Sequence, residues 1–227
     1  MDVTNLPLLV NTFVYFVIFV CGFAISIPLG VSRINSEGCL LYATLKPPGS
    51  SNYMYFLVFS NESNCEFPIF SGVIFCILYA LGMAIYNSCT IYKSQKDPSI
   101  ASKMCVIPFI MLNSLVTIIM LVASCMISVG FKEICDSMTK GKYEYFPSCI
   151  EAENQKLVIP ITKKISSTGR FYTLINVSQT ASWICTICWL ILVLSGIIQF
   201  VLNRRLETRE SAESDTGNRA LIGPTKW

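Results

Sequence analysis

The chain has 227 residues, of which 53% are hydrophobic and only 14% are charged, with a formal net charge of +3. Soluble domains carry about 25% charged residues, so this deficit predicts several membrane-spanning segments and little separate soluble material. The small net charge argues against a nucleic-acid partner, and the absence of histidine removes the commonest general base and the commonest metal ligand.

Four long runs without Asp, Glu, Lys or Arg follow one another along the chain, and Met104 to Phe131 is the clearest of them. A bilayer core needs about 20 apolar residues in a helix, so each run is long enough to span. The sequence therefore predicts an all-α membrane protein, a bundle of four transmembrane helices with a small disulfide-stapled cap outside. The predicted layout is an N-terminus at 1–7, spans at 8–30, 69–91, 104–131 and 180–201, outer loops at 31–68 and 132–179, an inner loop at 92–103, and a disordered tail at 202–227.

Small residues recur on one side of the first predicted helix. Gly22, Ser26 and Gly30 fall at i, i+4 and i+8 and form a ridge where another helix can approach closely. The ridge predicts a helix-packing surface.

The first outer loop contains two pieces that favour β-structure, Cys39 to Leu45 and Tyr53 to Ser60. The segment between them contains Pro47-Pro48-Gly49, a strong breaker of regular structure. This pattern allows a short β-hairpin, which would need support from a disulfide or from the other loop.

Four of the eleven cysteines lie in the two outer loops, and none lies in the inner loop or the tail. Cys39 and Cys65 bracket the first loop, while Cys135 and Cys149 lie in the second. Cysteines restricted to one side fit an oxidising lumenal or extracellular space. Pairing within each loop is favoured, and pairing across the loops remains the alternative.

The other cysteines lie in or near the helices. Cys89 and Cys105 would lie at the cytosolic ends of the second and third spans, where reversible palmitoylation occurs, although packing is the simpler interpretation. Cys185 and Cys188 form a C-x-x-C pattern, but hydrocarbon disfavours the thiolate that redox chemistry of this motif needs. We therefore expect these two to pack in the core.

Charge counting barely decides the orientation, because eight Lys and Arg lie on the side of the termini and nine on the side of the large loops. The dense group Lys93, Lys96 and Lys103 favours cytosolic termini. Both Asn-X-Ser sequons, at Asn61 and Asn176, fall on the opposite side and are candidate glycosylation sites. These features predict a protein of the secretory route, in the plasma membrane or an endosomal or granule membrane.

No phosphate-binding loop, nucleophile elbow or nucleotide fingerprint is present in the sequence. No catalytic residue, cofactor site or metal site can be named, and we expect no enzyme. No charged residue lies within a predicted span, which disfavours proton relays and ion-coupled carriers. An oligomeric pore remains open, with Asn11, Asn113, Thr117, Ser124 and Gln199 as the candidate lining residues.

Several short stretches together resemble the transmembrane protein 179 family, closer to its 179B type. They are Gly38 to Tyr42, Asn64-Cys65, Ile127 to Thr139, Pro147 to Cys149, Phe171-Tyr172 with Ala181 to Trp183, and Ala220 to Gly223 in the tail. The order and spacing of the four loop cysteines are also similar, over residues 8–203. The resemblance implies a four-helix membrane protein without an assigned catalytic activity. A claudin-like Trp-Gly-Leu-Trp signature is absent from the first outer loop, so the claudins fit this sequence less well.

Two functions follow as hypotheses. The first is a non-enzymatic tetraspan protein that associates laterally with other membrane proteins in the lipid bilayer. The alternative, from a different class, is a small channel or transporter subunit that forms or lines a pore as an oligomer. The sequence does not determine the oligomeric state.

Overall fold

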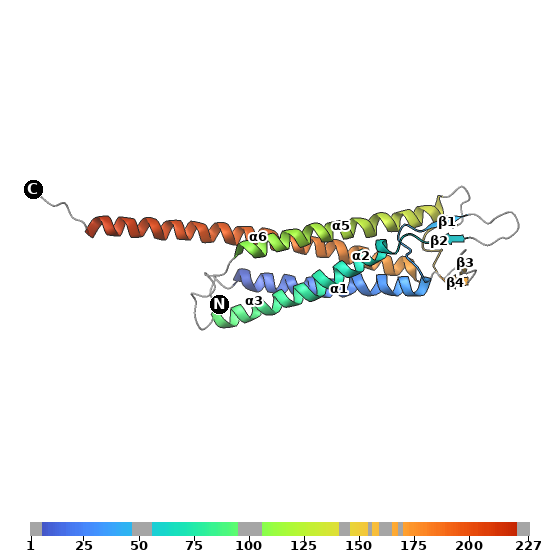
Figure 1. Ribbon diagram of the computed structural model, residues 1–227, viewed down its shortest axis with the longest axis horizontal. Helices are drawn as coiled ribbons and strands as arrows, with labels where there is room; N and C mark the ends of the chain where they lie inside the picture. Colours follow the sequence, from blue (N-terminus) through green and yellow to red (C-terminus); the bar gives the residue numbers. More distant parts are fainter. Residues whose placement is uncertain are drawn as a thin grey trace, which may run out of the picture.

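The computed structural model describes residues 6–46, 56–94, 106–140, 146–153, 156–158, 165–167 and 170–221. Long helices run side by side, and a small sheet covers one end of the bundle (Figure 1). The helices are α1 (Leu6–Ser36), a second continuous helix made of α2 (Ser63–Ser71), η2 (Gly72–Tyr79) and α3 (Ala80–Ser94), then α5 (Val106–Thr139) and α6 (Phe171–Leu221). The strands are β1 (Thr44–Lys46), β2 (Phe56–Val58), β3 (Lys156–Val158) and β4 (Ile165–Ser167).

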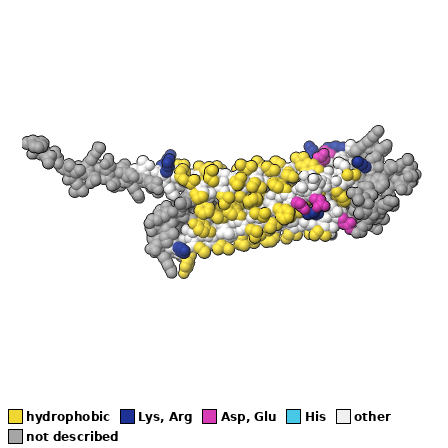
Figure 2. Space-filling model, in the orientation of Figure 1, with side chains coloured by type: hydrophobic (Ala, Val, Ile, Leu, Met, Phe, Trp, Pro, Cys, Tyr) yellow, Lys and Arg dark blue, Asp and Glu magenta, His cyan; other side chains and the backbone are white. Residues whose placement is uncertain are grey.

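The prediction of four spans is confirmed. Within the described residues, four helices are long and apolar enough to cross a membrane: Leu8–Ser36, Ser63–Lys93, Ile107–Thr139 and Phe171–Arg205. Helices are the natural form of such runs, because lipid offers no partner to a backbone N–H or C=O and an α-helix satisfies both internally. Apolar side chains cover the middle of the bundle surface, and charged side chains gather at its two ends (Figure 2).

All four helices extend farther toward the sheet than the predicted spans, by about two turns each. The estimate of about 20 residues gives only the minimum needed to cross hydrocarbon, and a helix can continue into water where packing supports it. Ile134, Met138 and Phe171 lie in these extensions and are fully buried. The hydrophobic core therefore continues along these extensions toward the sheet.

The predicted hairpin in the first outer loop is confirmed, with β1 antiparallel to β2 and Leu45 opposite Leu57. A second hairpin, β3 with β4, lies in the other outer loop and was not predicted. The two hairpins form one four-stranded sheet in the order β1-β2-β3-β4, because β2 pairs in parallel with β3 at Phe56 and Val158. The sheet thus joins the two outer loops.

The tail differs from the prediction of disorder, since α6 continues as a helix to Leu221. Its sequence after Arg204 is rich in Arg, Glu and Ala, which favour helix, and a helix that is already nucleated extends at low cost. Figure 1 shows α6 projecting past the other helices at the end opposite the sheet.

Candidate functional site

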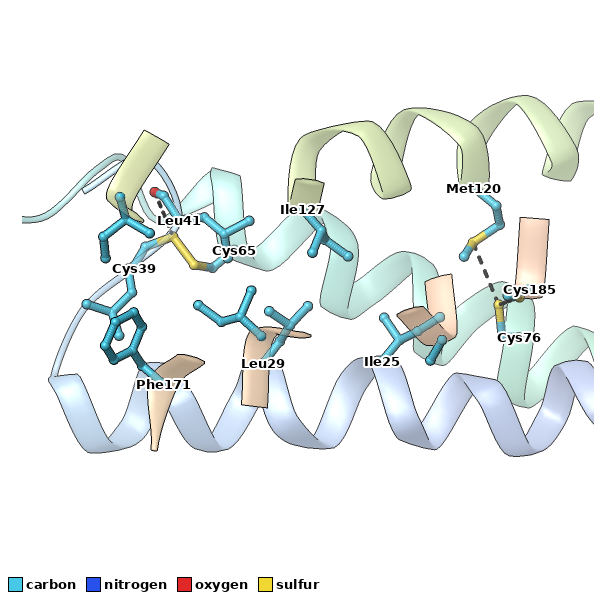
Figure 3. Close-up of a cluster of buried hydrophobic side chains, with 14 of the residues drawn as sticks. Ile25, Leu29, Cys39, Leu41, Cys65, Cys76, Met120, Ile127, Phe171 and Cys185 are labelled. Atoms are coloured by element: carbon cyan, nitrogen blue, oxygen red, sulfur yellow. Dashed lines mark hydrogen bonds between the residues drawn. A yellow bond between two sulfur atoms is a disulfide. The ribbon is translucent and has the colours of Figure 1, made fainter. Parts of the chain in front are cut away.

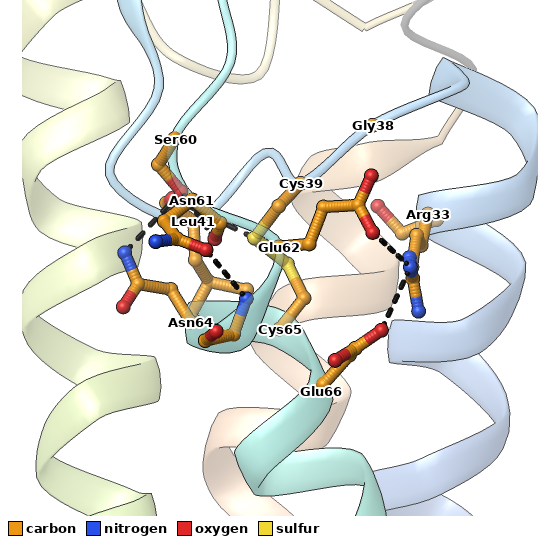
Figure 4. Close-up of a disulfide and its surroundings, with 12 residues drawn as sticks. Arg33, Gly38, Cys39, Leu41, Ser60, Asn61, Glu62, Asn64, Cys65 and Glu66 are labelled. Atoms are coloured by element: carbon orange, nitrogen blue, oxygen red, sulfur yellow. Dashed lines mark hydrogen bonds and ion pairs between the residues drawn. A yellow bond between two sulfur atoms is a disulfide. The ribbon is translucent and has the colours of Figure 1, made fainter.

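The cap consists of the four-stranded sheet and the two loops that contribute its strands. It is held to the bundle by a disulfide between Cys39 and Cys65 (Figure 4). Cys39 follows the end of α1 and Cys65 lies in the first turn of α2, and both are almost completely buried. The second disulfide joins Cys135 of α5 to Cys149. Each bond stays within one loop, so the structure has the pairing within loops and not the pairing across them.

An ion-pair cluster lies beside the first disulfide, where α1 meets α2 (Figure 4). One guanidinium nitrogen of Arg33 is 2.8 Å from a Glu62 carboxylate oxygen and 3.0 Å from a Glu66 carboxylate oxygen. These groups are partly exposed, so the pairs contribute little to stability. They lie near the ends of α1 and α2 that face the sheet.

Backbone contacts fix the cap on α5. The Tyr42 N–H donates to the Gly130 carbonyl at 3.2 Å, and Tyr42 has a positive φ of 62°. A Cβ added at Gly130 would lie 2.8 Å from a ring carbon of Tyr42, so the glycine allows the ring to lie directly on the helix. Burial and the nearby Glu133 carboxylate raise the pKa of Tyr42. The cap therefore packs directly against α5.

The second outer loop also holds the start of α6. The Glu153 carboxylate accepts a hydrogen bond from the Thr173 backbone N–H at 2.7 Å. The first N–H groups of a helix have no partner within the helix and carry partial positive charge, so a carboxylate there is favourable. The contact ties the loop stapled by Cys135 and Cys149 to the fourth span.

Inside the bundle, several polar side chains form hydrogen bonds with one another, whereas the buried indole nitrogen of Trp189 has no partner among the described residues. Asn113 of α5 donates to the Tyr15 hydroxyl at 2.9 Å and accepts from the Tyr79 hydroxyl at 2.8 Å. Trp189 of α6 stacks on Tyr79 with ring centroids 5.7 Å apart and meets Tyr15 edge-on. One asparagine thus links α1, η2 and α5, while its aromatic partners contact α6.

Three of the other candidate pore residues, Asn11, Thr117 and Ser124, make similar contacts, while Gln199 is half-buried on α6. Ser124 of α5 lies 3.0 Å from the Thr186 hydroxyl of α6, and Ser195 donates to Asn11 at 2.8 Å. Thr117 is buried and donates to the carbonyl of Asn113 in its own helix. These contacts lie within one chain, so Asn113, Thr117 and Ser124 do not face the outer surface of the bundle.

The small-residue ridge is used inside the chain. A Cβ at Gly22 would lie 2.8 Å from Ile77 Cγ1 and 2.9 Å from the Cβ of Cys76, both on η2. Ser26 donates to the Ile69 carbonyl at 3.3 Å, across the same contact. Gly30 has no atom within 4 Å of an added Cβ and takes no part in it. Gly22 and Ser26 therefore pack α1 against the second span and are not free for another protein.

The two sequons differ in their surroundings. Asn61 is exposed and lies just before α2. Its side-chain oxygen accepts a hydrogen bond from the backbone N–H of Ser63, the first residue of α2. Asn176 lies on α6, and Ser178 of its sequon is buried and donates to the Ile25 carbonyl at 3.1 Å. Asn176 itself lies within the candidate span Phe171–Arg205. This placement favours glycosylation of Asn61 and disfavours it at Asn176.

The palmitoylation candidates are only partly described. Cys89 is exposed near the end of α3, and Cys105 lies outside the described residues. Across the described ranges, no group of three or more His, Cys, Asp or Glu side chains is placed to hold a metal ion.

Two comparisons with known proteins identify the family. The sequence model described as the transmembrane protein 179/179B claudin domain matches residues 7–221. The chain is 26% identical over 196 residues to transmembrane protein 179B of Danio rerio, covering 85% of this chain and 84% of that protein. No solved structure matches. The matching model is described as a claudin domain, although the Trp-Gly-Leu-Trp signature is absent from this chain. The chain belongs to the transmembrane protein 179/179B family of claudin-type membrane proteins.

Proposed function

We propose that this protein is a non-enzymatic tetraspan membrane protein that acts by lateral association with other membrane proteins. The observation that carries the proposal is the internal pairing of the polar side chains of the spans, above all Asn113 with Tyr15 and Tyr79. A pore that forms between copies needs polar groups on the outer surface, and these groups are already engaged within one chain.

The same proposal includes an orientation. The two disulfides lie at the sheet end of the bundle, which fits a lumenal or extracellular cap. Lys93, Arg204 and Arg205 lie toward the opposite end, where basic residues favour the cytosol. Both termini would then be cytosolic, in a plasma, endosomal or granule membrane.

The cap is the part of the molecule that supports contact with a partner outside the bilayer. Both outer loops are joined in one sheet, and each loop is closed by its own disulfide. A pre-organised surface loses less conformational entropy on binding than flexible loops do. Ile150, beside Cys149, is 55% exposed on this surface.

The test is purification of tagged, full-length protein in a gentle detergent, followed by native mass measurement and identification of associated chains. A stoichiometric foreign membrane protein supports the proposal, and its loss on Ile150→Asp would place the contact on the cap. A lone monomer overturns it. A homo-oligomer that conducts ions in a reconstituted bilayer overturns it in favour of a channel subunit.

A further inference from the structure

A cluster of sulfur atoms lies at the centre of the bundle. The Cys76 and Cys185 sulfurs are 3.1 Å apart, and the Met120 sulfur is 3.6 Å from that of Cys76 (Figure 3). All three side chains are completely buried. They come from η2, α6 and α5, so three of the four spans meet at this point.

The position of Cys76 depends on two local features of the backbone. It lies within η2, a π-helical stretch of eight residues in the second span. Such stretches are rare and are often found at functional sites. Gly22 of α1 has no Cβ, which lets η2 approach α1 closely at Cys76.

We propose that Cys76 and Cys185 form a third disulfide, between the second and fourth spans, when the surrounding lipid is oxidised. Two sulfurs at this separation need only a small approach to bond, whereas Cys185 and Cys188 lie three residues apart on one helix and are poorly oriented for each other. The pair is formed by the fold and is not the C-x-x-C motif of the sequence.

The chemistry suits a site in hydrocarbon, where charged thiolates are disfavoured. The oxidant class is the lipid peroxyl radical, which removes a neutral hydrogen atom. One radical takes the S–H hydrogen of the first thiol and becomes a lipid hydroperoxide. A second radical takes the hydrogen of the other thiol, and the two sulfur radicals combine. Two S–H bonds break, two O–H bonds and one S–S bond form, and both thiols are oxidised while both radicals are reduced.

A disulfide here would cross the bundle diagonally. The second span packs mainly on α1, and α6 packs on α1 and α5, so η2 and α6 face each other through the core. The two loop disulfides do not join these helices. The new bond would fix the second span to the fourth.

The test uses full-length protein in lipid nanodiscs, with a specific protease site inserted between Lys96 and Asp97. A lipid-soluble azo initiator generates peroxyl radicals in the bilayer, and the protein is then cleaved and run on a non-reducing gel. The Cys39–Cys65 bond lies wholly in the first fragment and Cys135–Cys149 wholly in the second. Only a bond between the fragments can therefore keep them joined.

We expect joined fragments after oxidation, separation by reductant, and a linked Cys76–Cys185 peptide by mass spectrometry. Cys76→Ala and Cys185→Ala should lose the joined band, while the matched changes Cys21→Ala and Cys188→Ala should keep it. The unmodified protein should also gain thermal stability on oxidation, and Cys76→Ala should not.

The exposed thiols Cys89 and Cys125 report whether the oxidant reached the protein. Their consumption without a joined band overturns the proposal, as does a joined band that persists in Cys185→Ala. If the variants fail to fold, the peptide map of the unmodified protein decides between the same two outcomes, because it shows directly whether Cys76 is linked to Cys185.

Discussion

Gly22 of α1 lies so close to Cys76 of η2 that a Cβ at residue 22 would be 2.9 Å from the Cβ of Cys76 and 3.1 Å from its carbonyl carbon. Backbone lies on the far side of this contact, so the neighbour cannot move aside by rotating a side chain. The close packing of the first two spans therefore requires that residue 22 has no side chain.

Gly22→Ala should lower the stability of the bundle by about 1–3 kcal/mol, because an added methyl group over-packs the contact with η2. Gly30→Ala is the matched control on the same helix, since an added Cβ there meets nothing within 4 Å. The control should be neutral or slightly stabilising, because alanine favours helix over glycine. The melting temperature of detergent-purified protein measures both, and equal values would contradict the packing argument.

Asn113→Leu should cost about 1–3 kcal/mol, because it leaves the Tyr15 and Tyr79 hydroxyls without their shared partner inside the bundle. Ser114→Ala is the control next to it, since Ser114 donates only to the Ile110 carbonyl of its own helix. Replacing both tyrosines with phenylalanine in the Asn113→Leu protein should recover part of the loss. Stability is measured by heating each detergent-purified variant and following the fraction that still elutes as monodisperse protein. A loss of stability in Ser114→Ala as large as that in Asn113→Leu would refute the role of the shared hydrogen bonds.

The two disulfides should differ in their contribution to stability. Changing Cys39 and Cys65 to serine opens a loop with a sequence separation of 26, against 14 for Cys135 and Cys149. Loop-closure entropy makes the longer loop worth about 0.5 kcal/mol more. Burial acts in the same direction, because Cys39 and Cys65 are buried while Cys135 and Cys149 are half-buried. Melting temperatures of the two double variants test the order, which the reverse ranking would overturn.

Glycosylation should occur at Asn61 and not at Asn176. Asn61 is exposed ahead of α2, whereas the sequon of Asn176 lies on α6 at the level of Ile25. Asn61→Gln should abolish the mass shift that a glycosidase produces on protein from cultured cells, and Asn176→Gln should leave the shift unchanged. A shift that survives Asn61→Gln would contradict this placement. No shift in the unmodified protein would also count against a lumenal cap.

Several features could be predicted from particular residues of the sequence. The uncharged runs predict the spans because lipid requires length and an absence of charge, both of which are properties of one segment. The first hairpin could be predicted because Pro47-Pro48-Gly49 separates two pieces that favour β-structure. The second hairpin was missed, although Leu157, Val158 and Ile165 gave a weak signal, because its strands are three residues long and gain stability by pairing with β2.

The sequence by itself determined that this chain crosses a membrane as four helices with its loop cysteines at one end, because hydropathy and spacing are local properties. Only the tertiary structure decided what the polar and small residues do. Asn113 could have lined a pore, but it bonds to Tyr15 and Tyr79. Gly22 could have met a partner, but it meets η2. Cys185 is paired in sequence with Cys188 and in space with Cys76, 109 residues away. The packing of one helix against another depends on segments that lie far apart in the chain. The periodicity of a single helix does not show which other helix it packs against.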